Sequence, residues 1–86
     1  MVRYTKKNPQ GGYAVDTKIS KEETIDRLAA FENAYEALTE NIADLEKKLA
    51  DLKQQGKTNS ATFRQLLCKK VNYDNLRTFF SIHGVE

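Results

Sequence analysis

The feature that most constrains this chain is a run of large apolar residues between positions 28 and 52. Their spacing alternates between three and four residues through four heptads, which is the pattern of a helix that packs against another helix. The positions, which we call the seam, are Leu28, Phe31, Tyr35, Leu38, Ile42, Leu45, Leu49 and Leu52. The pattern predicts a long helix with one apolar side.

Both ends of this helix carry start and stop signals, which place it within residues 20–56. Ser20 stands three residues before Glu23, the arrangement of a capping box. Acidic residues fill the first turns and lysines the last turns, as the helix dipole favours. Gly56 suits the left-handed position that follows a helix end. We therefore expect one helix of about 36 residues, roughly 54 Å long.

Residues 1–19 precede the helix and contain a turn signal. The segments VRYTKK (2–7) and YAV (13–15) flank NPQGG. Proline suits the early part of a turn and paired glycines permit positive φ, so the pattern predicts a short β-hairpin. An irregular arm is the alternative.

Residues 57–86 are expected to form two short helices. Thr58, Asn59 or Ser60 can cap the first one. The segment VNYD (71–74) is expected to separate the two helices, with Asn72 as the cap of the second. Gly84 is expected to end the second helix. The apolar faces are Phe63, Leu66 and Leu67 in the first helix, then Leu76, Phe79, Phe80 and His83 in the second.

The expected fold is therefore mainly α and coiled-coil-like, in a single domain over residues 1–86. Two helices of about 15 Å each are too short to cover the whole seam. An uncovered apolar stripe usually marks an interface, so we expect a homodimer. An antiparallel pair is favoured, because it sets the acidic half of one long helix against the basic end of the other. The alternative is a monomer that wraps its own three helices.

The composition indicates the compartment and the class of the chain. Of 86 residues, 40% are hydrophobic and 30% are charged, as in an ordinary soluble domain. No apolar run approaches the length of a membrane span, and the start does not resemble a signal peptide. Cys68 is the single cysteine, which fits a reducing compartment. We expect a cytoplasmic protein that does not bind membranes.

The sequence proposes no catalytic or metal-binding set, so we expect no enzyme and no cofactor. His83 is the single histidine, and nothing follows zinc-ligand spacing. We expect its imidazole to be partly buried and to bond a carbonyl of the last helical turn. The glycine pair at 11–12 lies in the hairpin turn with no helix directly after it, so it is not a phosphate loop.

Charge is strongly segregated along the chain. The net charge is +4 over residues 1–21, −7 over 22–46 and +5 over 47–86. An acidic helix face can compete for a positively charged nucleic-acid groove on another protein. A solvated helix surface is the simpler interpretation of any one of these residues. The candidate partner-binding acidic face consists of Glu32, Glu36, Glu40, Asp44 and Glu46.

Nucleic-acid binding is the alternative function. The two C-terminal helices loosely resemble a helix-turn-helix, whose side chains could touch phosphates or base edges. The expected second helix offers a poor surface for a major groove, since it carries one arginine, one aspartate and two phenylalanines. The candidate contacts are Arg64, Lys69, Lys70 and Arg77.

Three phrases carry a resemblance to a known group: RYTKKNPQGGYAV, IDRLAAFENAYEAL and LKQQGKTNSATFRQLL. They resemble small uncharacterised proteins encoded by phages and prophages of Gram-positive bacteria. The resemblance implies a phage protein in the host cytoplasm, such as an anti-CRISPR-like inhibitor of a defence nuclease. It assigns no role to any residue. The expected function is therefore non-enzymatic binding to a host protein. A small DNA-binding regulator is the alternative, and a structural or assembly protein is a third hypothesis.

Overall fold

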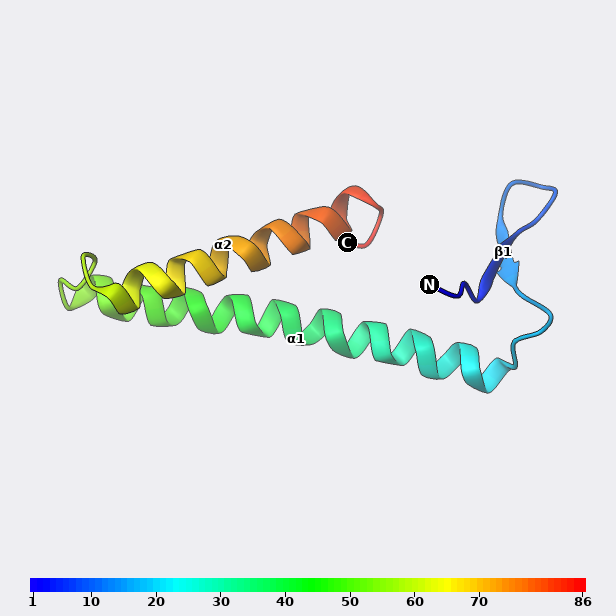
Figure 1. The fold of residues 1–86 in the computed structure, drawn as a ribbon, viewed down its shortest axis with the longest axis horizontal. Coiled ribbons are helices and arrows are strands. Elements are labelled where there is room, and N and C mark those ends of the chain that lie inside the picture. Colours follow the sequence, from blue (N-terminus) through cyan, green and yellow to red (C-terminus); the bar gives the residue numbers. More distant parts are fainter. The chain divides into compact units, whose positions relative to one another are not determined.

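The computed structural model describes residues 1–86 and is mainly helical. The elements are β1 (Thr5–Lys7), β2 (Tyr13–Val15), α1 (Lys21–Gln54) and α2 (Ala61–Ile82), in that order (Figure 1). The chain divides into two compact units, an N-terminal unit of Met1–Ala34 and a C-terminal unit of Tyr35–Glu86. The boundary falls inside α1.

The predicted hairpin is confirmed, with a first strand shorter than residues 2–7. β1 and β2 pair antiparallel, with Lys6 opposite Ala14. The side chain of Asn8 organises the turn, because its Oδ1 accepts the N–H groups of Gln10 at 3.1 Å and Gly12 at 2.9 Å. Gly11 takes a φ of 88°, which is the backbone freedom that the turn requires.

The predicted long helix is also confirmed, at 34 residues. At its start the Glu23 N–H donates to Ser20 Oγ at 3.1 Å, and the Ser20 hydroxyl donates to the Glu23 carboxylate at 3.2 Å. At its end Gly56 has a φ of 71°, and the Lys57 N–H donates to the Leu52 carbonyl at 2.9 Å. This left-handed cap satisfies carbonyls that the helix itself leaves unpaired.

The prediction of two short C-terminal helices is wrong, because α2 is one helix of 22 residues. Ser60 caps it by accepting the Phe63 N–H at 3.1 Å. The segment VNYD lies inside the helix, where Asp74 pairs with Lys70 at 2.7 Å and with Arg77 at 3.3 Å. Asparagine and aspartate cost a helix interior only about 0.7 kcal/mol each. Pairs one turn apart offset such a cost, and no glycine or proline breaks the segment.

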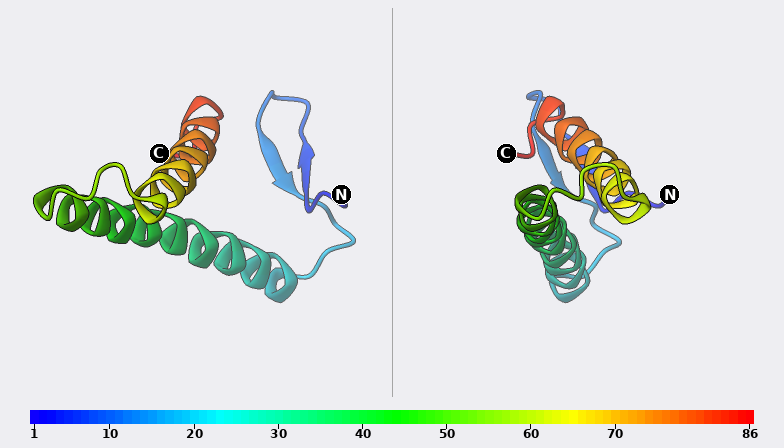
Figure 2. Two further views of the ribbon diagram at one scale, coloured as in Figure 1. Left: turned by 60° about the vertical axis from the view of Figure 1, so that its left-hand side comes forward. Right: turned by 90° about the vertical axis from the view of Figure 1, so that its left-hand side faces the viewer.

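In the C-terminal unit α2 runs back along α1 in the antiparallel direction (Figures 1 and 2). The rings of Tyr35 and Phe80 meet edge-on with centroids 5.8 Å apart, and Lys70 Nζ lies 3.8 Å from a Glu46 carboxylate oxygen. The buried core of the unit consists of Leu38, Ile42, Leu45 and Leu49. The single long α2 therefore covers this part of the seam.

The face of α2 that packs on α1 also differs from the expected one. Because the helix is continuous, Phe63 and Leu66 fix the direction of every later side chain. Leu76 and Phe79 consequently point outward and remain 44% and 57% exposed, whereas Phe80 lies on the packed side. The half-buried residues at heptad spacing on the packed side are Phe63, Leu66, Lys70, Tyr73, Arg77 and Phe80.

The N-terminal unit has no buried side chain. Arg27 of α1 ties the hairpin to the helix, because its guanidinium lies 4.2 Å from the centroid of the Tyr4 ring and donates to the Val2 carbonyl. The seam residues in this unit, Leu28 and Phe31, are 56% and 37% exposed. Neither α1 nor α2 combines the length and the apolar character that crossing a membrane demands.

Candidate protein-binding site

The acidic side chains of α1 in the C-terminal unit are centred on Glu36, Glu40 and Asp44. They follow one another at intervals of four residues and all three are exposed. At about 100° per residue, Glu40 projects from the side of the helix opposite Ile42 and Leu45. The packing of α2 on the seam therefore leaves these carboxylates on the outer side of α1.

Two of these carboxylates are not neutralised within the chain. Asp44 pairs with Lys48 at 3.0 Å, and both side chains are more than half exposed. Glu36 and Glu40 form no ion pair within 4.0 Å. Glu36 and Glu40 therefore present unpaired negative charge to an approaching partner.

One of the five predicted acidic residues lies away from this face. Glu46 lies at the side of α1 that borders α2, where it approaches Lys70. Glu32 belongs to the N-terminal unit and is exposed there. The name acidic face is kept below for Glu36, Glu40 and Asp44.

The ion pairs around Asp74 belong to the packing of α2 on α1 rather than to a binding surface. The hydrogen bond from Lys70 to Asp74 is the main cause of a raised pKa of the Lys70 ammonium, and the charges of Asp74 and Glu46 add to it. Lys70 therefore stays charged beside α1, where it bridges α2 to Glu46. Charged residues at packed positions of a helix pair commonly fix its register.

The four candidate nucleic-acid contacts do not form one surface. Arg64 Nη2 donates to the Asn59 carbonyl at 3.1 Å, and Lys69 Nζ lies 6.0 Å from the centroid of the Tyr73 ring. Lys70 and Arg77 point to the packed side of α2 and pair with Asp74. Because residues 61–82 form the single helix α2, the turn that a helix-turn-helix would need between two C-terminal helices is absent as well.

His83 makes the predicted bond, since its Nδ1–H donates to the Phe79 carbonyl at 2.9 Å, but the residue is exposed rather than partly buried. The imidazole also stacks on the Phe79 ring, with centroids 4.5 Å apart. No group of three histidine, cysteine, aspartate or glutamate side chains has the placement to hold a metal ion.

Sequence reasoning missed a groove of about 560 Å³ in the N-terminal unit. It lies where the start of the hairpin meets the first turns of α1, so it depends on a tertiary contact that no local pattern signals. Its walls are Met1, Arg3, Tyr4, Thr5, Thr24, Arg27, Leu28 and Phe31.

Comparison of the chain with protein-family models, curated proteins and solved structures finds no match.

Proposed function

We propose that the chain is a non-enzymatic, phage-encoded protein that acts in the host cytoplasm by binding a host protein. The acidic face would occupy a positively charged groove that the partner uses for nucleic acid. A defence nuclease is the class of partner that fits both this chemistry and the phage resemblance, so the action would be anti-CRISPR-like inhibition.

The observation that carries the proposal is the unpaired state of Glu36 and Glu40 on the outer side of a long, well-capped helix. A helix holds successive carboxylates about 6 Å apart along its axis, close to the spacing of phosphates along a nucleic-acid strand, so the two can occupy the same basic groove. The opposite side of α1 is anchored by the core, which keeps the acidic face available for a partner.

The test is affinity capture from a lysate of a Gram-positive host, with three versions of the chain used in parallel. The first is the natural chain and the second carries Glu36→Gln and Glu40→Gln. The third is a matched control with Gln54→Lys and Gln65→Lys, both at exposed positions, which changes the net charge equally but keeps the acidic face. Captured proteins are identified by mass spectrometry and challenged with duplex DNA.

We expect a nucleic-acid-binding protein to be retained by the natural chain and by the control. The Glu36→Gln, Glu40→Gln variant should lose it, and added DNA should displace it. Equal capture by all three versions would refute the acidic face as the contact. A salt-dependent shift of duplex DNA by the pure chain would instead favour the DNA-binding regulator.

The proposal includes self-association, but through a different surface from the seam. α2 already covers Leu38–Leu49, whereas the outer face of α2 exposes Val71, Phe79 and Ile82 at 47%, 57% and 75%. These three side chains project within about 80° of one another around the helix. We propose a homodimer through this face. Because it would pair α2 with α2, the α1 charges that favoured an antiparallel pair along the seam do not decide its orientation.

A further inference from the structure

Both edges of the two-stranded hairpin are open, and the hydrogen-bond pattern shows which groups the β1 edge exposes. The Tyr4 carbonyl accepts the Asp16 N–H at 2.9 Å, and the Asn8 N–H donates to the Gly12 carbonyl at 2.9 Å. Even-numbered residues of the first strand therefore bond β2, and the backbone groups of Thr5 and Lys7 point away from it. Since the sheet has two strands, these groups have no strand partner.

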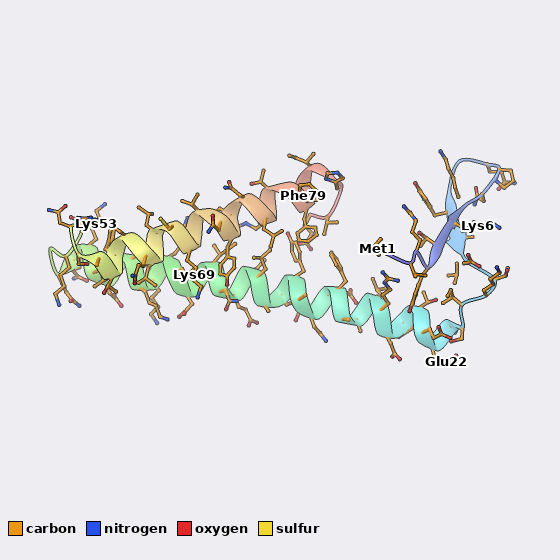
Figure 3. All side chains as sticks on the ribbon, viewed as in Figure 1. Met1, Lys6, Glu22, Lys53, Lys69 and Phe79 are labelled. Carbon is orange, nitrogen blue, oxygen red and sulfur yellow. The ribbon has the colours of Figure 1, made fainter.

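The groove of the N-terminal unit, which has Met1 among its walls (Figure 3), reaches the start of this open edge. Arg3, Tyr4 and Thr5 are consecutive, and all three line the groove. Thr5 is the first residue of β1, and Arg3 and Tyr4 lead into it, so a segment in the groove meets the strand edge at Thr5. Leu28 and Phe31 of α1 supply an apolar wall on the other side.

The groove carries positive charge that the chain does not neutralise. Arg3 and Arg27 line it, no acidic residue does, and neither arginine forms an ion pair. Arg3 donates to Thr5 Oγ1 at 3.1 Å, and Arg27 is held by Tyr4 and Val2. A guanidinium has five N–H donors, so both retain donors for a carboxylate.

We propose that this groove binds an extended, acidic segment of a partner protein, which adds to the edge of β1 as a third strand. The main chain of the segment would bond the outward groups of Thr5 and Lys7, in the manner of β-strand addition. Its carboxylates would meet Arg3 and Arg27, and its aliphatic side chains would contact Leu28 and Phe31.

The charges of β1 argue against a second copy of the same strand as the occupant. Lys6 and Lys7 lie on β1, and pairing two such strands would place like charges close together. The proposal is independent of the acidic face, because the two surfaces lie in different units and prefer partners of opposite charge.

The test uses the full chain labelled with ¹⁵N and a capped peptide of alternating valine and glutamate, about eight residues long and able to form one strand. We expect the backbone amide signals of Thr5 and Lys7 to shift on titration. A second peptide with N-methyl groups at alternate residues keeps the charge but lacks one edge of donors. It should bind at least about fivefold more weakly if strand addition operates.

Two charge reversals separate the groove from general attraction. Arg3→Glu alters the groove, whereas Lys18→Glu makes the same charge change at an exposed position of the same unit that does not line it. Arg3→Glu should weaken the binding of the valine–glutamate peptide about fivefold or more. Lys18→Glu should weaken it less than about twofold. Equal loss in both variants, undiminished binding of the N-methylated peptide, or unshifted Thr5 and Lys7 amides would each overturn the proposal.

Discussion

Asp74 illustrates how single residues decide the course of α2. Its carboxylate accepts hydrogen bonds from Lys70, one turn before it, and from Arg77, one turn after it. The sequence context VNYD favours a helix cap, since asparagine and aspartate bond nearby backbone groups in turns. The paired cations and the capped start at Ser60 outweigh that local preference, and the helix continues to Ile82.

The substitution Asp74→Asn should lower the free energy of unfolding in a way that depends on pH. The raised pKa of Lys70 means that its contribution to stability is complete below its ordinary value of 10.5. This contribution is lost as the pH rises through the raised pKa. The difference between natural chain and variant should therefore shrink in strongly alkaline solution, as measured by urea unfolding at neutral and alkaline pH.

Asp51→Asn is the matched control, because it removes the same charge from an exposed position without an ion pair. It should leave the stability nearly unchanged at both pH values. A loss in Asp74→Asn that is identical at all pH values would show that Lys70 is not stabilised by this carboxylate.

At the scale of elements, the local signals and the tertiary arrangement were predictable to different degrees. Residues close together in the sequence form the helix caps at Ser20 and Gly56 and the turn at Asn8. The hairpin and α1 could therefore be predicted. The direction of Leu76 and Phe79 could not, because it depends on a register set more than ten residues earlier by Phe63. The spacing of the acidic residues predicted that Glu36, Glu40 and Asp44 share one side of α1. The position of Glu46 beside Lys70 could not be predicted, because it depends on how α2 packs on α1.

Leu45→Asp should unfold the C-terminal unit or cost it several kcal/mol, because a carboxylate at this position would be buried without a partner. Leu45 is 4% exposed in the core between the helices. Thermal unfolding followed by circular dichroism measures the effect. Leu76→Asp is the control, since this leucine points outward, and it should cost less than about 1 kcal/mol. Similar losses in both variants would contradict the observed packing face of α2.

For the whole molecule, the apolar surface that remains exposed is more informative than the small core. All four buried side chains belong to the C-terminal unit, between Leu38 and Leu49. A chain of this size with so few buried residues is marginal alone and often gains stability from a partner. The outer face of α2 is the natural candidate within that unit for pairing with a second copy.

Phe79→Glu should convert a dimer into a monomer while preserving helix content, because the side chain is 57% exposed and does not belong to the core. A charge at the centre of an apolar contact would remain unpaired on association. Sedimentation velocity at micromolar concentration measures the change. Gln65→Glu adds the same charge outside this surface and should leave the dimer intact. A natural chain that sediments as a monomer would refute self-association.

The confinement of the core to residues 38–49 has an evolutionary consequence. Apart from the residues of the groove, substitutions in Met1–Ala34 disturb no buried side chain, so packing constrains this part of the sequence less than it constrains the helix pair. The hydrophobic residues of the helix pair evolve under the opposite constraint, since each must keep its volume. Relatives of this chain should therefore share their C-terminal halves long after their first thirty or so residues have ceased to align.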